Sequence, residues 1–256
     1  MKEAYDVRQG RLQADSQYSG ETSDDNRVYE ALERLTFVLG FDRFAISHHV
    51  DLLHPPVGAY GLTNYDSDWL NEILSGQYFL DDPVQISCDG RNTGFLWPNP
   101  RMLETLTPRQ RYIFEQGAKR NLRGGYTVPM HLPGEYAGSC TFATSRLDTV
   151  PSEAMPAAFF AVSFAFEAMR RVVRLRAGLE LPAPPKLKPR EREVLILLGR
   201  GKTYGEIADI LHLSEHTTHE YAKRIMRAYG NIQRNNLIAR ALFDGIVTYP
   251  ELLSMH

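Results

Sequence analysis

The segment from Leu187 to Val247 constrains the fold more than any other part of the chain, because signals that begin and end helices recur along it. Pro189 suits the first turn of a helix, and Gly201 suits the left-handed residue that follows one. The pattern predicts four short helices: the first from Pro189 to about Arg200, the second capped by Thr203, the third capped by Ser214 and ended by Gly230, and the fourth from about Asn235 to Asp244. We therefore expect an all-α domain that contains a helix-turn-helix.

The second predicted helix packs one face into the core of this domain. Thr203 and Glu206 stand in the spacing of a capping box, so the helix begins there. Its apolar residues recur at helical spacing and are expected to face inward. They are Ile207, Ala208, Ile210 and Leu211.

The third predicted helix has the two faces of a helix that reads DNA. Its outward face carries hydrogen-bonding groups near the start and cations further along, an order that suits contacts to base edges first and to phosphates later. The residues that we expect to contact DNA are Thr203, Ser214, His216, Thr217, His219, Glu220, Lys223, Arg224 and Arg227. The alternative is a solvated amphipathic helix in a four-helix domain that does not bind DNA, and the acidic Glu220 favours that alternative.

Charge is divided unevenly along the chain. The net charge is −2, with 29 Lys and Arg against 31 Asp and Glu. From Lys186 onward there are 11 basic and 8 acidic residues, which leaves a net charge of −5 for the rest. The positive charge therefore lies in the segment predicted to bind DNA, although the excess is small and is a weak argument by itself.

Cysteine content and the N-terminal residues argue against several classes of protein. Cys88 and Cys140 are too few for a disulfide framework, and no cluster of Cys and His suggests a metal site. The first residues lack an apolar signal core, and no run of about 18 apolar residues could cross a membrane. We expect a soluble cytoplasmic protein with reduced thiols, no metal and no cofactor.

The remainder of the chain predicts a second kind of domain. Residues 1–24 are polar and aperiodic, so we expect a flexible arm there. From 25 to 176, strands alternate with helices and a long helix comes last, which indicates an α/β/α sandwich. The proline-rich residues 177–188 are expected to be a semi-rigid linker. The fold class is therefore α+β, with this sandwich followed by the helical domain at 189–256.

The C-terminal segment resembles the helix-turn-helix of the LuxR family over its whole length, without a gap. Glu191, Leu195 and Gly201 stand at three of the family's most characteristic positions. The match continues through Gly201-Lys202-Thr203, Glu206-Ile207-Ala208, Leu213-Ser214 and Thr217. In related proteins the positions of His219 and Lys223 read bases. Lys188 departs from the family, which usually has Thr or Ser as this cap, so we expect a frayed start to the first helix.

The N-terminal part resembles the acyl-homoserine lactone-binding domain of quorum-sensing regulators, over roughly residues 25–176. The residues that carry the resemblance are Thr63-Asn-Tyr65, Trp69, Tyr78 to Val84, Trp97, Gly125 to Pro129 and Thr141. The intervals from Trp69 to Asp82 and from Asp82 to Trp97 fit the family without insertion. Together the two resemblances imply a ligand-responsive transcription regulator of quorum sensing.

The resemblance implies a role for each residue of the expected ligand site. Trp69 would donate its indole N–H to the ring carbonyl of an N-acyl-homoserine lactone, and Asp82 would accept from the amide N–H. Tyr65 and Thr141 would donate to the amide carbonyl, and Trp97 would pack against the ring. A mostly apolar pocket with a few polar anchors is the usual design of such sites.

Ile73 is the main departure in this expected ligand site, because the family typically has Tyr there. A methyl-rich wall would alter the acyl-chain preference or indicate another ligand class. A regulator of another small molecule therefore stays open, as does one that acts without ligand. An enzyme such as a lactone or amide hydrolase is a further alternative, but no G-x-S-x-G motif, metal-ligand cluster or nucleophile–base pair supports it.

The resemblance also implies a homodimer on double-stranded DNA. The long helix predicted at 152–176 and the fourth helix of the C-terminal domain are the candidate dimer contacts. Two recognition helices would then read a two-fold symmetric site. Some family members bind DNA only with ligand, and others are released from DNA by it. Whether the ligand promotes or relieves DNA binding therefore stays open.

Overall fold

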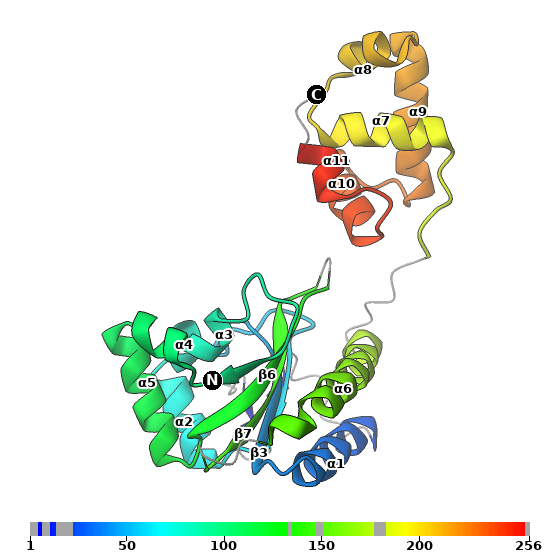
Figure 1. The fold of residues 1–256 in the computed structure, drawn as a ribbon. Helices are drawn as coiled ribbons and strands as arrows, with labels where there is room; N and C mark the ends of the chain where they lie inside the picture. Colours follow the sequence, from blue (N-terminus) through cyan, green and yellow to red (C-terminus); the bar gives the residue numbers. More distant parts are fainter. Residues whose placement is uncertain are drawn as a thin grey trace. The chain divides into compact units, whose positions relative to one another are not determined.

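The computed structural model in Figure 1 describes residues 5–6, 11–13, 23–132, 135–146, 151–176 and 183–253. The chain divides into two compact units, residues 1–180 and 181–256. The division falls within the expected linker at 177–188, of which residues 177–182 lie outside the described part. Among the helices that the structure describes, each is too short or too polar to cross a membrane.

The N-terminal unit is built on one seven-stranded antiparallel sheet, in the order β1-β2-β4-β3-β7-β6-β5. The strands are β1 (Tyr5–Asp6), β2 (Arg11–Gln13), β3 (Arg43–His48), β4 (Tyr60–Thr63), β5 (Phe95–Trp97), β6 (Gly124–Met130) and β7 (Gly138–Thr144). At the centre β3 pairs with β7 from Arg43 opposite Ala143 to His48 opposite Gly138. This central pair joins two segments that lie far apart in the sequence.

Helices cover both faces of the sheet (Figure 1), with α1 and α6 on one face and α2 to α5 on the other. Their bounds are α1 (Ser23–Val38), α2 (Ser67–Ser75), η1 (Tyr78–Leu80), α3 (Pro83–Ile86), α4 (Pro100–Thr105), α5 (Pro108–Lys119), η3 (Ser152–Ala154) and α6 (Met155–Arg176). Successive strand residues point to opposite faces, and Phe44, Ile46 and Phe142 are fully buried in the core beneath α1 and α6. The α/β/α arrangement expected from the sequence is confirmed.

The sequence prediction is wrong about part of the N-terminal arm. Residues 5–6 and 11–13, expected to be flexible, form β1 and β2, and β2 pairs with β4 from Arg11 opposite Leu62 to Gln13 opposite Tyr60. Residues 1–4, 7–10 and 14–22 of that arm lie outside the described part. An edge strand offers a row of unpaired backbone groups, so β4 can pair with a segment that has no strand pattern of its own.

The C-terminal unit is entirely helical in its described part. It contains α7 (Pro189–Gly199), α8 (Tyr204–Leu211), α9 (Glu215–Ala228), α10 (Arg234–Phe243) and α11 (Tyr249–Leu253). The four helices expected from the sequence are confirmed, and the short α11 is an addition. Leu195, Ile207, Ile225 and Leu237 are fully buried and form the centre of its core.

Local signals define the helix ends in this unit. The Thr203 hydroxyl accepts the N–H of Glu206 at 3.3 Å, and the Glu206 carboxylate accepts the N–H of Thr203 at 2.8 Å, which completes the capping box. Ser214 Oγ accepts the N–H of Thr217 at 3.0 Å. Gly201 has a φ of +83°, the left-handed conformation that favours glycine.

Two details differ from the sequence prediction. Ile210 is 49% exposed instead of lying in the core, because it lies about 200° around the helix from the buried Ala208. The start of α7 is held instead of frayed. Lys188 has no side-chain acceptor, but the Glu191 carboxylate accepts its N–H at 2.8 Å, so the reciprocal half of a capping box secures the first turn.

Candidate functional site

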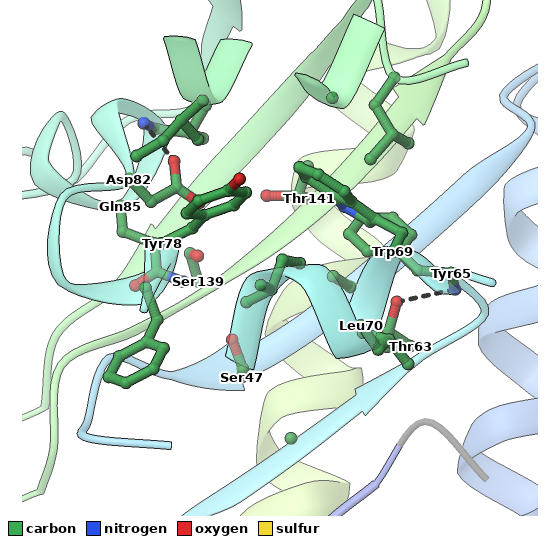
Figure 2. Close-up of a pocket in the computed structure, with 18 of the residues that line it drawn as sticks. Ser47, Thr63, Tyr65, Trp69, Leu70, Tyr78, Asp82, Gln85, Ser139 and Thr141 are labelled. Carbon is green, nitrogen blue, oxygen red and sulfur yellow. Dashed lines mark hydrogen bonds between the residues drawn. The ribbon is translucent and has the colours of Figure 1, made fainter. Parts of the chain in front are cut away.

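A cavity of about 140 Å³ lies in the N-terminal unit between the sheet and the helices of the α2–α5 face (Figure 2). Its floor consists of side chains on one face of three neighbouring strands: Ala45 and Ser47 on β3, Gly61 and Thr63 on β4, and Ser139 and Thr141 on β7. These residues are small, so the floor leaves room between sheet and helices. The walls are mostly apolar and include Leu70, Leu74, Phe79, Ile113, Phe114 and Leu122.

The structure brings together all six residues expected at the ligand site. Tyr65, Trp69, Ile73, Asp82, Trp97 and Thr141 all line this cavity. They come from α2, the loop before it, the turn before α3, and strands β5 and β7. Segments that are separated in the sequence therefore converge on one space, although their contact with a ligand stays a prediction.

Two of these side chains, Trp69 and Ile73, lie on α2 and line the cavity. Asp66 caps the helix by accepting the N–H of Trp69 at 2.9 Å. Ile73 lies one turn further along the helix, on the same face as Trp69. The Thr63 hydroxyl accepts the N–H of Tyr65 at 3.1 Å (Figure 2), which orders the loop just before α2. The cap thus sets the direction of Trp69, whose side chain is buried.

Asp82 caps α3 and presents a carboxylate to the cavity. One of its oxygens accepts the N–H of Val84 at 2.8 Å. The residue is half-buried and lines the cavity. Burial therefore raises the pKa of Asp82, and the N–H groups of Val84 and Gln85 offset part of that effect. A ligand N–H that reached the carboxylate would relieve this cost.

Trp97 is held by a hydrogen bond within the sheet. Its indole N–H donates to the Thr127 hydroxyl at 2.9 Å, and the Thr127 and Thr141 hydroxyls lie 2.8 Å apart. The ring lies against Gly125, where an added Cβ would come within 2.7 Å of it. Trp97 thus offers the cavity a flat surface, and Thr127 positions Thr141. The role of Thr127 depends on the pairing of β6 with β7, which the sequence analysis did not resolve.

The outward face of α9 presents the cations expected to contact DNA. His216, Lys223, Arg224 and Arg227 are exposed, whereas Thr217, His219 and Glu220 are half-buried. The His219 ring packs against Tyr204 of α8, with ring centroids 5.0 Å apart. This contact fixes the imidazole at the junction of the two helices of the helix-turn-helix.

Several of these side chains already have partners within the unit. Lys223 Nζ lies 3.2 Å from a Glu220 oxygen, and Arg224 Nη1 lies 3.8 Å from the buried Glu191 carboxylate. The hydroxyls of Thr203 and Ser214 cap α8 and α9. Thr203 and Ser214 therefore have structural roles in addition to the DNA contacts expected of them.

Comparison with known proteins identifies both units. Residues 24–172 match the family described as "Autoinducer binding domain", and residues 185–241 match "Bacterial regulatory proteins, luxR family". The chain belongs to the LuxR family. It is a ligand-responsive DNA-binding regulator of quorum sensing.

Relatives of this LuxR-family protein match most of its length. Transcriptional activator protein AhyR of Aeromonas hydrophila is 25% identical over 252 residues, covering 94% of each chain. Transcriptional activator protein BjaR1 of Bradyrhizobium diazoefficiens is 26% identical over 184 residues, covering 72% of this chain and 74% of BjaR1.

Two solved structures share the fold. The crystal structure of Escherichia coli SdiA matches with a TM-score of 0.54 and 21% identity, covering 92% of this chain and 94% of SdiA. The structure of SdiA in complex with octanoyl-rac-glycerol matches with a TM-score of 0.57 and 22% identity, covering 90% and 92%.

Several lining residues of the LuxR-family protein were given no role by the sequence analysis. The polar ones are Ser47, Thr63, Tyr78, Gln85 and Ser139. The Tyr78 ring lies 5.8 Å from that of Trp69, and its hydroxyl donates to Glu72 at 3.2 Å. Ser47 and Ser139 could have been predicted from the alternation of side chains on β3 and β7. On these strands small polar residues alternate with large buried ones.

Asp82→Asn tests the cost of burying this carboxyl. Because the folded-state pKa is raised above its ordinary value of 3.8, the ligand-free protein loses stability as the pH rises through the folded-state pKa. Asn keeps the helix cap. We therefore expect the variant to unfold at a higher temperature than the wild type at pH 7, by roughly 2–4 °C. The gain should shrink as the pH falls toward 3.8, the ordinary pKa of Asp.

Tryptophan fluorescence suits this measurement, because Trp69 and Trp97 both lie in the N-terminal unit. Asp81→Asn is the control, since the Asp81 side chain is 50% exposed and lies near Arg109. A variant at position 82 that is less stable than the wild type at pH 7 would contradict the burial argument.

Proposed function

We propose that the cavity binds an N-acyl-homoserine lactone and that the bound lactone controls DNA binding by the C-terminal unit. The convergence of Trp69, Asp82 and Thr141 on one mostly apolar space carries this proposal. An acylated lactone offers two carbonyls, one amide N–H and an apolar chain. These match an indole donor, a carboxylate acceptor, hydroxyl donors and the aliphatic walls of the cavity.

Each polar group of the ligand has a partner in the proposed complex. The Trp69 indole donates to the ring carbonyl, and Asp82 accepts from the amide N–H. Tyr65 and Thr141 donate to the amide carbonyl, with Thr141 positioned by Thr127. The ring of Trp97 packs against the lactone. The ligand completes the core of the N-terminal unit and stabilises the folded state by mass action.

In the C-terminal unit, α9 is proposed to enter the major groove of double-stranded DNA. His219, in the first half of α9, and Lys223, one turn further on, are proposed to contact bases, and Arg227 lies further along for a phosphate. The Tyr204 ring holds His219 in place. As a DNA-binding regulator the protein is proposed to act in the cytoplasm, and no catalytic step is assigned to it.

A homodimer is proposed to form through α6. This helix exposes Phe159, Phe160 and Phe164, of which Phe160 and Phe164 are 67% and 63% exposed with ring centroids 5.0 Å apart. Large exposed aromatic patches mark interaction surfaces. A two-fold pair of chains would present two α9 helices to a two-fold symmetric site.

A second ligand class is supported by Ile73, which lines the cavity where the family typically has Tyr. SdiA was solved in complex with octanoyl-rac-glycerol. Glycerol hydroxyls could donate to Asp82 as an amide N–H does. An acylglycerol is therefore the competing ligand to test beside the lactones.

Thermal unfolding with a panel of acyl-homoserine lactones and acylglycerols tests the ligand proposal. We expect one lactone to raise the unfolding temperature with the logarithm of its concentration above Kd. The free energy of unfolding should rise by about 2.7 kcal/mol at a hundredfold excess over Kd. Asp82→Asn should abolish the rise and Asp81→Asn should retain it. The lactone should be recovered intact, and its hydrolysis would favour the enzyme alternative. Stabilisation by acylglycerols alone would reject the lactone.

Lys223→Ala tests the reading of bases by α9. If Lys223 contacts a base edge, the variant should lose about 1–3 kcal/mol at the cognate site and much less at unrelated DNA. Fluorescence anisotropy at a fixed salt concentration measures both. Lys186→Ala, an exposed lysine before α7, is the control. An equal loss on every sequence would instead show that Lys223 contacts a phosphate.

Phe160→Asp tests the proposed dimer. A charge in the centre of an apolar contact should weaken association, so we expect sedimentation equilibrium to show monomer where the wild type is dimeric. Val57→Asp, at a position that is 58% exposed in the loop between β3 and β4, is the control. A dimer that is unchanged by Phe160→Asp would rule out α6 as its main contact.

A further inference from the structure

The cavity has a second polar group of residues, distinct from those assigned to the lactone head. Ser47 and Ser139 stand directly opposite each other on β3 and β7, and Gln85 of α3 lines the same space (Figure 2). Ser139 precedes Thr141 by two residues on the same face, so it lies about 7 Å further along the strand. Ser139 and Ser47 therefore line a part of the cavity further along the strands than Thr141, and the proposed ligand would extend its acyl chain there.

Ser139 has hydrogen-bonding capacity left for a ligand. Its hydroxyl lies 2.8 Å from Nε2 of His49, and burial lowers the pKa of His49 to about 4, so the imidazole is neutral at pH 7. If Nε2 carries the proton, it donates to Ser139, whose own hydroxyl proton then points to the Cys88 thiol or to the cavity, and one lone pair of Oγ is left. If Nε2 accepts, Ser139 Oγ keeps its lone pairs. In either tautomer Ser139 can bind one further polar atom.

The same argument applies to Ser47 and Gln85, for whose side chains no hydrogen bond is found in the described part of the chain. A plain alkyl chain laid across these three residues would take them out of contact with water and give no partner in return. Each unpaired group of this kind lowers affinity by roughly ten- to a hundredfold. A site built to hydrogen-bond a ligand oxygen thus discriminates strongly against the analogue that lacks it.

We infer that the acyl group of the ligand carries an oxygen on its distal part, as a hydroxyl or a carbonyl, and that Ser139, Ser47 and Gln85 bind it. The position is roughly five carbon–carbon bonds beyond the amide carbonyl in an extended chain, from the spacing of Ser139 and Thr141. A hydroxyl fits best, because it satisfies Ser139 in both tautomers of His49. This inference rests on the proposed function and narrows its ligand class.

The serine and histidine side chains resemble a nucleophile and its base, but the surroundings favour binding. A histidine with a pKa of about 4 is a weak general base at neutral pH. The neighbouring Cys88 is also unsuited to nucleophilic attack, since burial raises the pKa of its thiol to about 12. The pair therefore orients a hydroxyl toward the cavity.

Calorimetric titration with three lactones of equal chain length tests the inference: N-octanoyl-, N-(6-hydroxyoctanoyl)- and N-(3-oxooctanoyl)-homoserine lactone. We expect the 6-hydroxy compound to bind the full-length protein at least about tenfold more tightly than the octanoyl compound. Ser139→Ala and, independently, Ser47→Ala should reduce that preference toward onefold while leaving octanoyl binding unchanged or improved. Ser163→Ala, at an exposed serine on α6, should keep it.

The outcomes separate this inference from the proposed function. Equal binding of the octanoyl and 6-hydroxy compounds would overturn the inference and leave the lactone site intact. The largest gain from the 3-oxo compound would also overturn it, because the bound oxygen would then lie beside the lactone head. Failure of all lactones in this titration and in the wider panel would refute the proposed function, and this inference with it.

Discussion

The pairing of β3 with β7 is the constraint on which the rest of the N-terminal unit depends. It gives the sheet two different faces. One carries Phe44, Ile46 and Phe142, which pack beneath α1 and α6. The other carries Ala45, Ser47, Ser139 and Thr141, whose small side chains leave the cavity open. A shift of β7 by one residue against β3 would turn the side chains of β7 to the opposite face, placing Phe142 in the cavity and Ser139 and Thr141 in the core.

The charge of Asp82 makes this cavity favour a ligand that donates a hydrogen bond. The carboxylate caps α3 and also faces an apolar space, so its ionised form is under-solvated until a donor arrives. A ligand N–H that reaches the carboxylate would remove this desolvation cost and so increase the affinity. A ligand without a donor would not. In the proposed complex the same interaction links ligand to fold, because the ligand would replace solvent in the middle of the N-terminal unit. Coupling of this kind allows a sensor domain to respond to a small molecule without a separate hinge.

Local signals in the sequence were reliable where neighbours in the chain make the contact. The capping box at Thr203 and the left-handed Gly201 involve atoms within a few residues of one another. One prediction failed where a distant segment decides, because β2 is ordered by the edge of β4. The Lys188 end of α7 was predicted to fray from the cap residue alone, but it is held by Glu191, three residues further along. Ile210 follows an apolar pattern, yet the packing of α8 leaves it half exposed.

By itself, the sequence determined the two-domain organisation and the helix-turn-helix, because motif spacing and helix caps are local properties. The six residues expected at the ligand site came from the resemblance to a known family. Only the tertiary structure decided that these six residues share one cavity with Ser47, Gln85 and Ser139, and that Thr127 connects Trp97 to Thr141. These relations depend on strand register and on which face of each strand a side chain occupies. Both are set by pairing between segments far apart in the chain, which no local pattern encodes.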